Sequence, residues 1–204
     1  MTGKLITIEG IDGVGKTTHT NRLIQHLQNQ NLPIVYTYEP GGTPIADRIR
    51  AIIRDEQNAG MSQKAELMLF LSSRAEHIQK VIKPSLQQGK IVICDRFIDS
   101  TIAYQGYGQG LDIDILHTLN AYVTDSIVPD LTIWLDLDPQ LGFARKGGKD
   151  TTDRMETYNH EFYNRVYQGF ATISAQNPRI AQINASGTVE QTHQLIIQQV
   201  DKIL

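Results

Sequence analysis

The chain has 204 residues, of which 40% are hydrophobic, so it is long enough to bury a sizeable core but short for two independent domains. Its 22 acidic and 19 basic side chains give a net charge of −3, which excludes the strong positive field of a duplex nucleic-acid binder. Its single cysteine, Cys94, excludes an intramolecular disulfide and a multi-cysteine zinc site.

Apolar runs alternate with helical periodicities along the whole chain, which is typical of an α/β fold with a five-stranded parallel sheet and helices on both faces. The predicted strands are Leu5–Glu9, Ile34–Tyr38, Ile91–Asp95, Leu131–Leu137 and Ile180–Asn184. The predicted helices are Lys16–Asn29, Pro44–Arg54, Gln63–Leu86, Asp112–Thr124, Pro139–Lys146, Glu156–Gln176 and Val189–Leu204, with Asp138 and Thr188 as helix caps.

No internal repeat and no Pro/Gly/Ser linker divides these elements, so we expect residues 1–204 to form one domain. No stretch approaches the length of a membrane span or of a signal-peptide core, so we expect a cytoplasmic protein with no membrane partner.

The first strand runs into Gly10-Ile11-Asp12-Gly13-Val14-Gly15-Lys16-Thr17, which fits the phosphate-binding pattern Gly, four residues, Gly-Lys-Ser/Thr and opens a predicted helix. Its glycines let the backbone turn so that N–H groups converge on phosphate oxygens at the positive end of that helix. We expect Lys16 to reach the β- and γ-phosphates and the Thr17 hydroxyl to bind Mg²⁺. The predicted ATP-binding residues are Gly10, Ile11, Asp12, Gly13, Val14, Gly15, Lys16, Thr17 and Thr18.

The third strand ends at Asp95, where a carboxylate can face the metal bound by Thr17, and Arg96 follows it. An adjacent Asp-Arg pair is often a surface ion pair, but a phosphate loop upstream favours a metal ligand and an arginine beside the transferring phosphate. The chain has neither the Asn-Lys-x-Asp element that reads guanine nor the Leu-Ser-Gly-Gly-Gln element of transporter ATPases. Both of those classes are disfavoured. Cys94, within the same apolar run, is expected to be a buried core thiol.

Two glycine-rich or polar stretches, Gln105–Gly110 and Arg145–Asp153, are predicted to be loops, and ligands are expected at loops that leave the carboxyl ends of parallel strands. A charge run at a helix end is usually a solvated face. The two glycines between the cations of the second stretch instead predict a mobile lid, at about residues 145–155, able to close over ATP.

Several further segments follow the phosphate loop in a fixed order, and together they resemble the bacterial lid-type thymidylate kinases over nearly the whole chain. They are Glu39-Pro40-Gly41-Gly42-Thr43, Phe70-Leu71-Ser72-Ser73-Arg74-Ala75-Glu76-His77, Asp95-Arg96-Phe97-Ile98-Asp99-Ser100-Thr101, Ala103-Tyr104-Gln105-Gly106, Pro129-Asp130-Leu131-Thr132 and Asp153-Arg154-Met155-Glu156. The resemblance implies a P-loop nucleoside monophosphate kinase architecture and a homodimer. It also implies transfer of the γ-phosphoryl group of MgATP to dTMP, giving dTDP and ADP, in dTTP synthesis.

The resemblance also implies roles for individual residues. Phe70 would stack on thymine, Arg74 and Gln105 would hydrogen-bond the base edge, and Tyr104 would pack beneath the sugar. Asp12 would contact the sugar hydroxyl, while Arg50 and Arg96 would hold the acceptor phosphate. The implied substrate-binding set is Asp12, Glu39, Arg50, Phe70, Arg74, Arg96, Ser100, Thr101, Tyr104 and Gln105; the metal ligands are Thr17 and Asp95; the catalytic set is Lys16, Asp95, Arg96, Arg145, Lys149 and Arg154.

The chain departs from the family pattern at Tyr38, where an arginine is usual, so Arg50 or Arg96 would have to supply that phosphate contact. The loop segment 11–14 has no cation, and the resemblance therefore assigns the charge beside the transferring phosphate to the lid. The choice among Arg145, Lys149 and Arg154 stays open.

Two other functions remain as alternatives: another nucleotide or deoxynucleoside kinase, or a non-catalytic module that senses nucleotides. For single residues, core packing of Phe70 and solvent exposure of Arg74 are the ordinary alternatives. The separate acceptor-side cluster argues against a sensor, which needs no second phosphate site.

Overall fold

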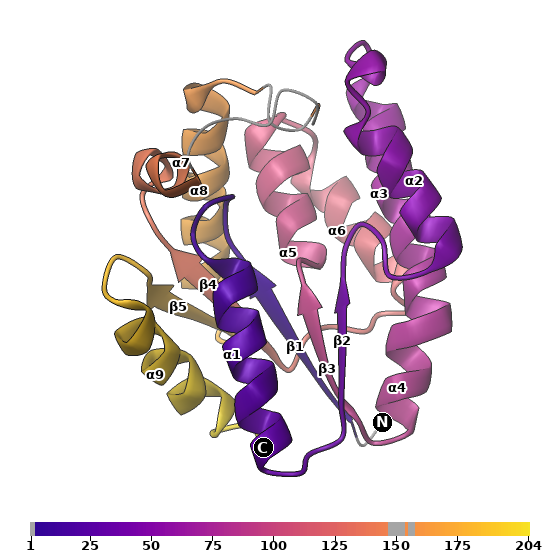
Figure 1. Ribbon diagram of the computed structural model, residues 1–204. Helices are drawn as coiled ribbons and strands as arrows, with labels where there is room; N and C mark the ends of the chain where they lie inside the picture. The colour runs from indigo at the N-terminus through magenta and orange to yellow at the C-terminus, as the bar shows by residue number, and fades with distance from the viewer. Residues whose placement is uncertain (1–2, 147–153, 155–157) are drawn as a thin grey trace.

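The computed structural model describes residues 3–146, 154 and 158–204 (Figure 1). Five strands form one sheet in the order β2-β3-β1-β4-β5, and every neighbouring pair is parallel. The parallel α/β sheet is therefore confirmed, and three of the predicted strands have unchanged bounds. The strands are β1 (Lys4–Glu9), β2 (Ile34–Tyr38), β3 (Ile91–Asp95), β4 (Leu131–Asp136) and β5 (Ile180–Asn184).

Helices connect the strands, as their periodicity predicts. They are α1 (Lys16–Asn29), α2 (Pro44–Arg54), α3 (Gln63–His77), α4 (Lys83–Gln87), α5 (Ile98–Thr101), α6 (Ile113–Val123), α7 (Pro139–Lys146), α8 (His160–Gln176) and α9 (Val189–Val200). A π-helical stretch, Ile78–Ile82, joins α3 to α4, so the predicted helix Gln63–Leu86 is continuous but changes its winding.

The sheet is covered on both faces because successive strand residues point in opposite directions. In β1, Ile6 and Ile8 belong to the core cluster that also contains Leu23 of α1. Leu5, which precedes Ile6 and points to the opposite face, packs with Ile82 in a second cluster beside α4. Helices α1 and α9 contact each other and cover one face together, as Figure 1 shows, while α4 and α8 pack on the other.

Helix caps predicted from the sequence are present. Thr188 and Gln191 form a reciprocal capping box at the start of α9. The Asp138 side chain accepts a hydrogen bond from the Gln140 backbone N–H, 2.8 Å, at the start of α7. These local signals explain why both helices begin where the sequence predicts.

The predicted loop Gln105–Gly110 is wrong over most of its length, because residues Ile102–Gly108 form a π-helical continuation of α5. The glycines serve close packing. A Cβ added to Gly106 would lie 2.4 Å from Ile113, and one added to Gly108 would lie 2.6 Å from Phe162. The absence of side chains therefore lets this helix approach α6 and α8, instead of marking a turn.

The phosphate-loop sequence lies between β1 and α1, at the carboxyl end of a strand near the centre of the sheet. Side chains that follow β2 and β3 lie at the same edge. Within the described residues, no helix is both long and apolar enough to cross a lipid bilayer.

Candidate active site

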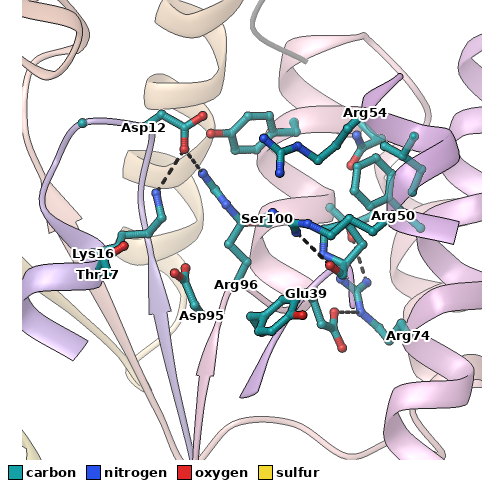
Figure 2. Close-up of a pocket in the computed structure, with 18 of the residues that line it drawn as sticks. Asp12, Lys16, Thr17, Glu39, Arg50, Arg54, Arg74, Asp95, Arg96 and Ser100 are labelled. Carbon is teal, nitrogen blue, oxygen red and sulfur yellow. Dashed lines mark hydrogen bonds and ion pairs between the residues drawn. The ribbon is translucent and has the colours of Figure 1, made fainter. Parts of the chain in front are cut away.

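A cleft of about 850 Å³ opens at the carboxyl ends of β1, β2 and β3, and Figure 2 shows its charged side chains converging from opposite walls. Most of the predicted donor-side and acceptor-side residues line this one cleft. They are Asp12, Gly13, Gly15, Lys16, Thr17, Thr18, Glu39, Arg50, Phe70, Arg74, Asp95, Arg96, Ser100, Thr101, Tyr104 and Gln105.

The phosphate loop has the backbone that its glycines predict. Gly10, Gly13 and Gly15 have φ values of 136°, 82° and 95°, which side-chain-bearing residues rarely adopt. The Lys16 ammonium turns back over the loop and donates to the Gly10 and Ile11 carbonyls, 3.1 and 2.9 Å away. The lysine is therefore held over the concave side of the loop, where phosphate oxygens would lie.

Asp12 lies among three cations at the mouth of this loop. Its Oδ1 accepts hydrogen bonds from Arg96 at 2.6 Å and from Lys16 at 3.4 Å (Figure 2). Burial alone would raise the pKa of Asp12, but the positive charges of Arg96, Lys16 and Lys146 outweigh it and hold the pKa well below its usual range. Asp12 is thus a carboxylate that offsets the repulsion of cations gathered for a polyanion.

Arg96 is held in an unusual conformation. Its φ is 69°, in the left-handed region that disfavours side chains with a Cβ. Its guanidinium donates to the Gly10 carbonyl at 2.9 Å and to the Ser100 hydroxyl at 3.3 Å, and it lies 5.1 Å from the centre of the Tyr104 ring. This strain places a guanidinium between the donor and acceptor ends of the cleft.

A buried glutamate at the end of β1 supports this turn. Glu9, at the end of β1, accepts hydrogen bonds from the Phe97 N–H at 2.7 Å and from the Ser100 hydroxyl at 2.5 Å. Burial and the nearby Asp99 carboxylate raise the pKa of Glu9 to about 7. The chain around Arg96 is therefore tied to β1 by a group that titrates near neutrality.

We expect Glu9 to make stability depend on pH. Its pKa is higher in the folded chain than in the unfolded chain, so the folded state retains the proton better, and stability falls as pH rises from about 4.5 to about 7. Glu9→Gln, a neutral isostere whose NH₂ can donate to Ser100, should abolish this fall, which we place at about 1–3 kcal/mol. Urea unfolding of both proteins at pH 5, 6, 7 and 8 measures it. Parallel stability curves would contradict the prediction.

Asp95 and Thr17 lie on the donor side of the cleft. Asp95 Oδ1 is buried and has no hydrogen-bond partner among the residues that the structure describes. Thr17 is exposed at the start of α1, and Figure 2 shows Asp95 on the same side of the cleft as Thr17 and Lys16. An unpartnered carboxylate oxygen and a hydroxyl are the kinds of ligand that Mg²⁺ takes. These residues therefore fit a magnesium ion bound together with phosphates.

Tyr38, at the position where the resemblance leads one to expect an arginine, supports the side chain of Arg50. The Arg50 guanidinium carbon lies 5.4 Å from the centre of the Tyr38 ring, and Arg50 donates to the Pro40 carbonyl at 2.8 Å. The Tyr38 hydroxyl donates to Asp47 at 3.0 Å. The hydrogen bond to Asp47 thus fixes the Tyr38 ring, and the Arg50 guanidinium packs against that ring.

The Arg74 side chain is buried and hydrogen-bonded, with only 3% of its surface exposed, and is not a solvated charge. It donates to Glu39 at 2.7 Å, to Thr101 at 2.8 Å and to Asn120 at 2.6 Å, and also to the Phe97 carbonyl at 3.0 Å. Four of the five donors of a guanidinium are therefore engaged by protein groups. The carboxylate of Glu39 is occupied by Arg74 and, at 2.9 Å, by His77. Glu39 thus positions Arg74 at the wall of the cleft.

The remaining acceptor-side residues also lie at this wall. Gln105 is buried and its amide nitrogen donates to Glu66, 3.1 Å away. The Tyr104 hydroxyl is buried without a hydrogen-bond partner in the described structure, and burial raises its pKa. Phe70, half-buried, lines the cleft with them, so its ring is available to a ligand.

Three of the predicted ATP-binding residues and two of the predicted lid cations, Arg145 and Arg154, do not line the cleft. Ile11 and Val14 have buried side chains, so they and Gly10 can offer only backbone groups. Arg145 donates to the Ala185 carbonyl at 2.9 Å, beyond β5. Arg154 is buried and pairs with Glu66 at 2.6 Å. Lys149 lies outside the described residues, as does most of the predicted lid.

Sequence reasoning missed several residues that line or support the cleft, among them Glu9, Tyr36, Arg54 and Lys146. Burial and the neighbouring Asp95 carboxylate raise the pKa of Tyr36, which places the phenol near the predicted metal ligand. Sequence spacing gave one usable signal: Tyr36 and Tyr38 are two residues apart in β2 and therefore point to the same face of the sheet. The others depend on contacts between distant segments.

Comparisons with known proteins agree with this geometry. The thymidylate kinase family profile matches residues 8–196. Thymidylate kinase of Symbiobacterium thermophilum is 42% identical over 200 residues, covering 98% of this chain and 93% of the relative. That of a Psychrobacter species is 45% identical and covers 99% of both chains. The crystal structure of thymidylate kinase from Ehrlichia chaffeensis matches with a TM-score of 0.81 at 38% identity, covering 98% of this chain and 100% of that one.

Proposed function

This chain belongs to the thymidylate kinase family, and on that premise we propose which residues perform each part of its reaction. The enzyme transfers the γ-phosphoryl group of ATP to dTMP, giving ADP and dTDP for dTTP synthesis. The single observation that carries the assignment is the shared cleft, since donor-side and acceptor-side residues line the same 850 Å³ space. Two nucleotides bound there would have their phosphates facing each other.

On the donor side, backbone N–H groups of residues 10–18 hold the phosphates of ATP, and Lys16 leaves the loop carbonyls to bind the β- and γ-phosphates. Thr17 and Asp95, whose Oδ1 has no hydrogen-bond partner among the described residues, would hold Mg²⁺. When bound, that ion neutralises charge on the phosphate oxygens. Lys16 and Arg96 supply the protein's own share of that neutralisation.

On the acceptor side, Arg50 and Arg96 hold the 5′-phosphate of dTMP with guanidinium forks that match its oxygens. One of those oxygens attacks the γ-phosphorus in line, the bond to the oxygen that bridges the β- and γ-phosphates breaks, and ADP leaves with the electron pair. The attacking oxygen is already anionic, so no general base is required. The residues act by aligning two polyanions and offsetting their repulsion.

The nucleoside lies deeper in the cleft, where Phe70 stacks on thymine and Tyr104 packs beneath the sugar, whose hydroxyl Asp12 contacts. Arg74 has one donor left over after its four protein contacts, and we propose that it binds the O4 atom of thymine. The Gln105 amide oxygen accepts the N3–H. The supporting residues are Glu39, Ser100 and Thr101.

A coupled ADP-release assay with a panel of monophosphates tests this assignment. We expect kcat/KM to be highest for dTMP and lower for dUMP by roughly tenfold, because one methyl group contributes only about 1–3 kcal/mol. AMP and GMP should be rejected far more strongly, since a purine ring does not fit between the aromatic platform and two hydrogen-bonding side chains. Comparable kcat/KM for AMP or GMP would overturn the assignment and favour another nucleotide kinase.

The lid prediction is that a cation at about residues 145–155 stabilises charge on the transferring phosphoryl group. Lys146 now joins the predicted set, because it lines the cleft and its charge acts on Asp12, whereas Arg145 is bonded to the Ala185 carbonyl. Alanine at the responsible residue should lower kcat by about a hundredfold with much less effect on the KM for dTMP.

Single alanine variants of Arg145, Lys146, Lys149 and Arg154 would be compared at saturating ATP, with circular dichroism to check folding. Arg145→Ala is the matched comparison for Lys146→Ala, one residue away on the same helical turn. Wild-type turnover by all four single variants and by the fourfold variant would show that the lid carries no catalytic charge.

We also propose a cytoplasmic homodimer acting as one domain per chain. Exposed apolar side chains support the dimer: Ile45 and Ile52 lie one heptad apart on α2, Met68 lies on α3 and Ile115 on α6. Helix α3 contacts both α2 and α6, so these side chains belong to one helical layer. Sedimentation velocity of the wild-type chain would test the proposal, and a monomer at micromolar concentration would contradict it.

A further inference from the structure

A buried carboxylate lies behind the acceptor end of the cleft. Glu66 on α3 is 1% exposed, although glutamate is almost never fully buried unless it is paired. Its Oε1 accepts hydrogen bonds from the amide nitrogens of Gln105 and Gln109, 3.1 and 2.6 Å away. Its Oε2 accepts from Arg154 at 2.6 Å and from the Tyr158 hydroxyl at 3.5 Å. All of these partners are donors.

This arrangement fixes the orientation of one amide. A carboxylate whose oxygens meet the Arg154 guanidinium, two amide NH₂ groups and a hydroxyl acts only as an acceptor toward them. The Gln105 side chain must therefore present its NH₂ group to Glu66. Its carbonyl oxygen is left for the other side, where Gln105 lines the cleft. A rotation of the amide by 180° would bring two acceptors together in a buried site.

We propose that Glu66 is a positioning residue that makes the acceptor site specific for pyrimidines carrying an N3–H donor. Thymine and uracil have a donor at N3 and an acceptor at O4, whereas cytosine has an acceptor at N3 and a donor at N4. A Gln105 carbonyl held toward the base accepts a hydrogen bond from the N3–H of thymine or uracil and repels the N3 lone pair of cytosine. The inference rests on the proposed contact of Gln105 with the base.

Specificity of this kind needs a fixed amide, because a glutamine that rotates freely offers either a donor or an acceptor to its ligand. Sites built to pair a particular hydrogen-bonding group reject analogues that lack it, since their own buried polar groups are then left unpaired. Glu66 removes the freedom of Gln105 without touching the ligand. Gln109, on the same oxygen, does not line the cleft and offers a matched control.

The test compares dTMP with 5-methyl-dCMP, which shares the methyl group, sugar and phosphate and differs only at N3 and position 4. The measured quantity is the ratio of kcat/KM for the two nucleotides in the wild type, Glu66→Gln, Gln105→Met, the double variant and Gln109→Met. We expect Glu66→Gln to lower the ratio at least tenfold. In the Gln105→Met background the same substitution should change the ratio less than twofold. Gln109→Met should leave the ratio unchanged.

Each failure has its own meaning. If Gln105→Met alone leaves the ratio unchanged, the proposed contact of Gln105 with the base is wrong. If Gln105→Met lowers the ratio but Glu66→Gln lowers it equally with and without Gln105, Glu66 acts through Arg154 or through stability, and the inference is overturned. Should Glu66→Gln fail to fold, Glu66→Asp replaces it, since the shorter carboxylate keeps its charge but withdraws from Gln105. The same dependence on Gln105 is then required.

Discussion

Replacing Lys16 with alanine should leave a folded protein whose kcat is lower by about a thousandfold or more, a loss typical of removing a charge aimed at the transferring phosphate. Among the residues that the structure describes, the ammonium donates hydrogen bonds to the Gly10 and Ile11 carbonyls and to Asp12, all within the loop itself. None of these three acceptors is a side chain of a strand or of the core. The catalytic loss should therefore far exceed the loss of stability.

Circular dichroism and ADP release would be measured on the same preparation of Lys16→Ala. The control is Gln25→Ala, which changes an exposed position of α1 that does not line the cleft and keeps the ammonium. A well-folded Lys16→Ala protein with near-normal turnover would rule out the phosphate-loop assignment.

Replacing Arg96 with glycine should lower kcat/KM for dTMP by a similar factor, of order a thousandfold. Its guanidinium lies between Gly10 of the phosphate loop and Ser100, at the junction of the donor and acceptor sites. Glycine is the appropriate replacement because φ at this position is 69°, a value that glycine adopts without strain. The backbone turn should thus survive while the charge is lost.

Binding of thymidine, which has no phosphate, distinguishes the mechanism from a distorted site. Isothermal titration should show dTMP affinity falling in Arg96→Gly while thymidine affinity changes less than threefold. If both affinities fall together, Arg96 shapes the pocket instead of holding the acceptor phosphate.

The sheet was predictable because each strand is a short apolar run bounded by polar residues, and the helices because their caps are local. Thr188 and Gln191, three residues apart, define the start of α9 without help from the rest of the chain. The helix over Ile102–Gly108 was not predictable in this way. Its glycines resemble a loop until Phe162, more than fifty residues later, packs against Gly108.

The site was predictable at the level of residue types and less so at the level of contacts. Sequence spacing brought Arg74 to the acceptor end, but its partner Asn120 is 46 residues away and gives no local signal. Arg154 is similar, since the sequence marks it as a lid cation and the structure pairs it with Glu66, 88 residues away. Such pairings follow from the order of strands and the packing of helices, which no local pattern contains.

The position of Cys94 gives the chain a built-in reporter. Its thiol is fully buried in β3 and donates to the Arg96 carbonyl at 3.1 Å, and burial raises its pKa well above the usual value. A thiol reagent can react only when β3 separates from its neighbours. Because no other cysteine competes, the labelling rate under native conditions measures how often β3, which ends at Asp95 just before Arg96, separates from its neighbours. Nucleotides that bind at Asp95 and Arg96 should slow the labelling.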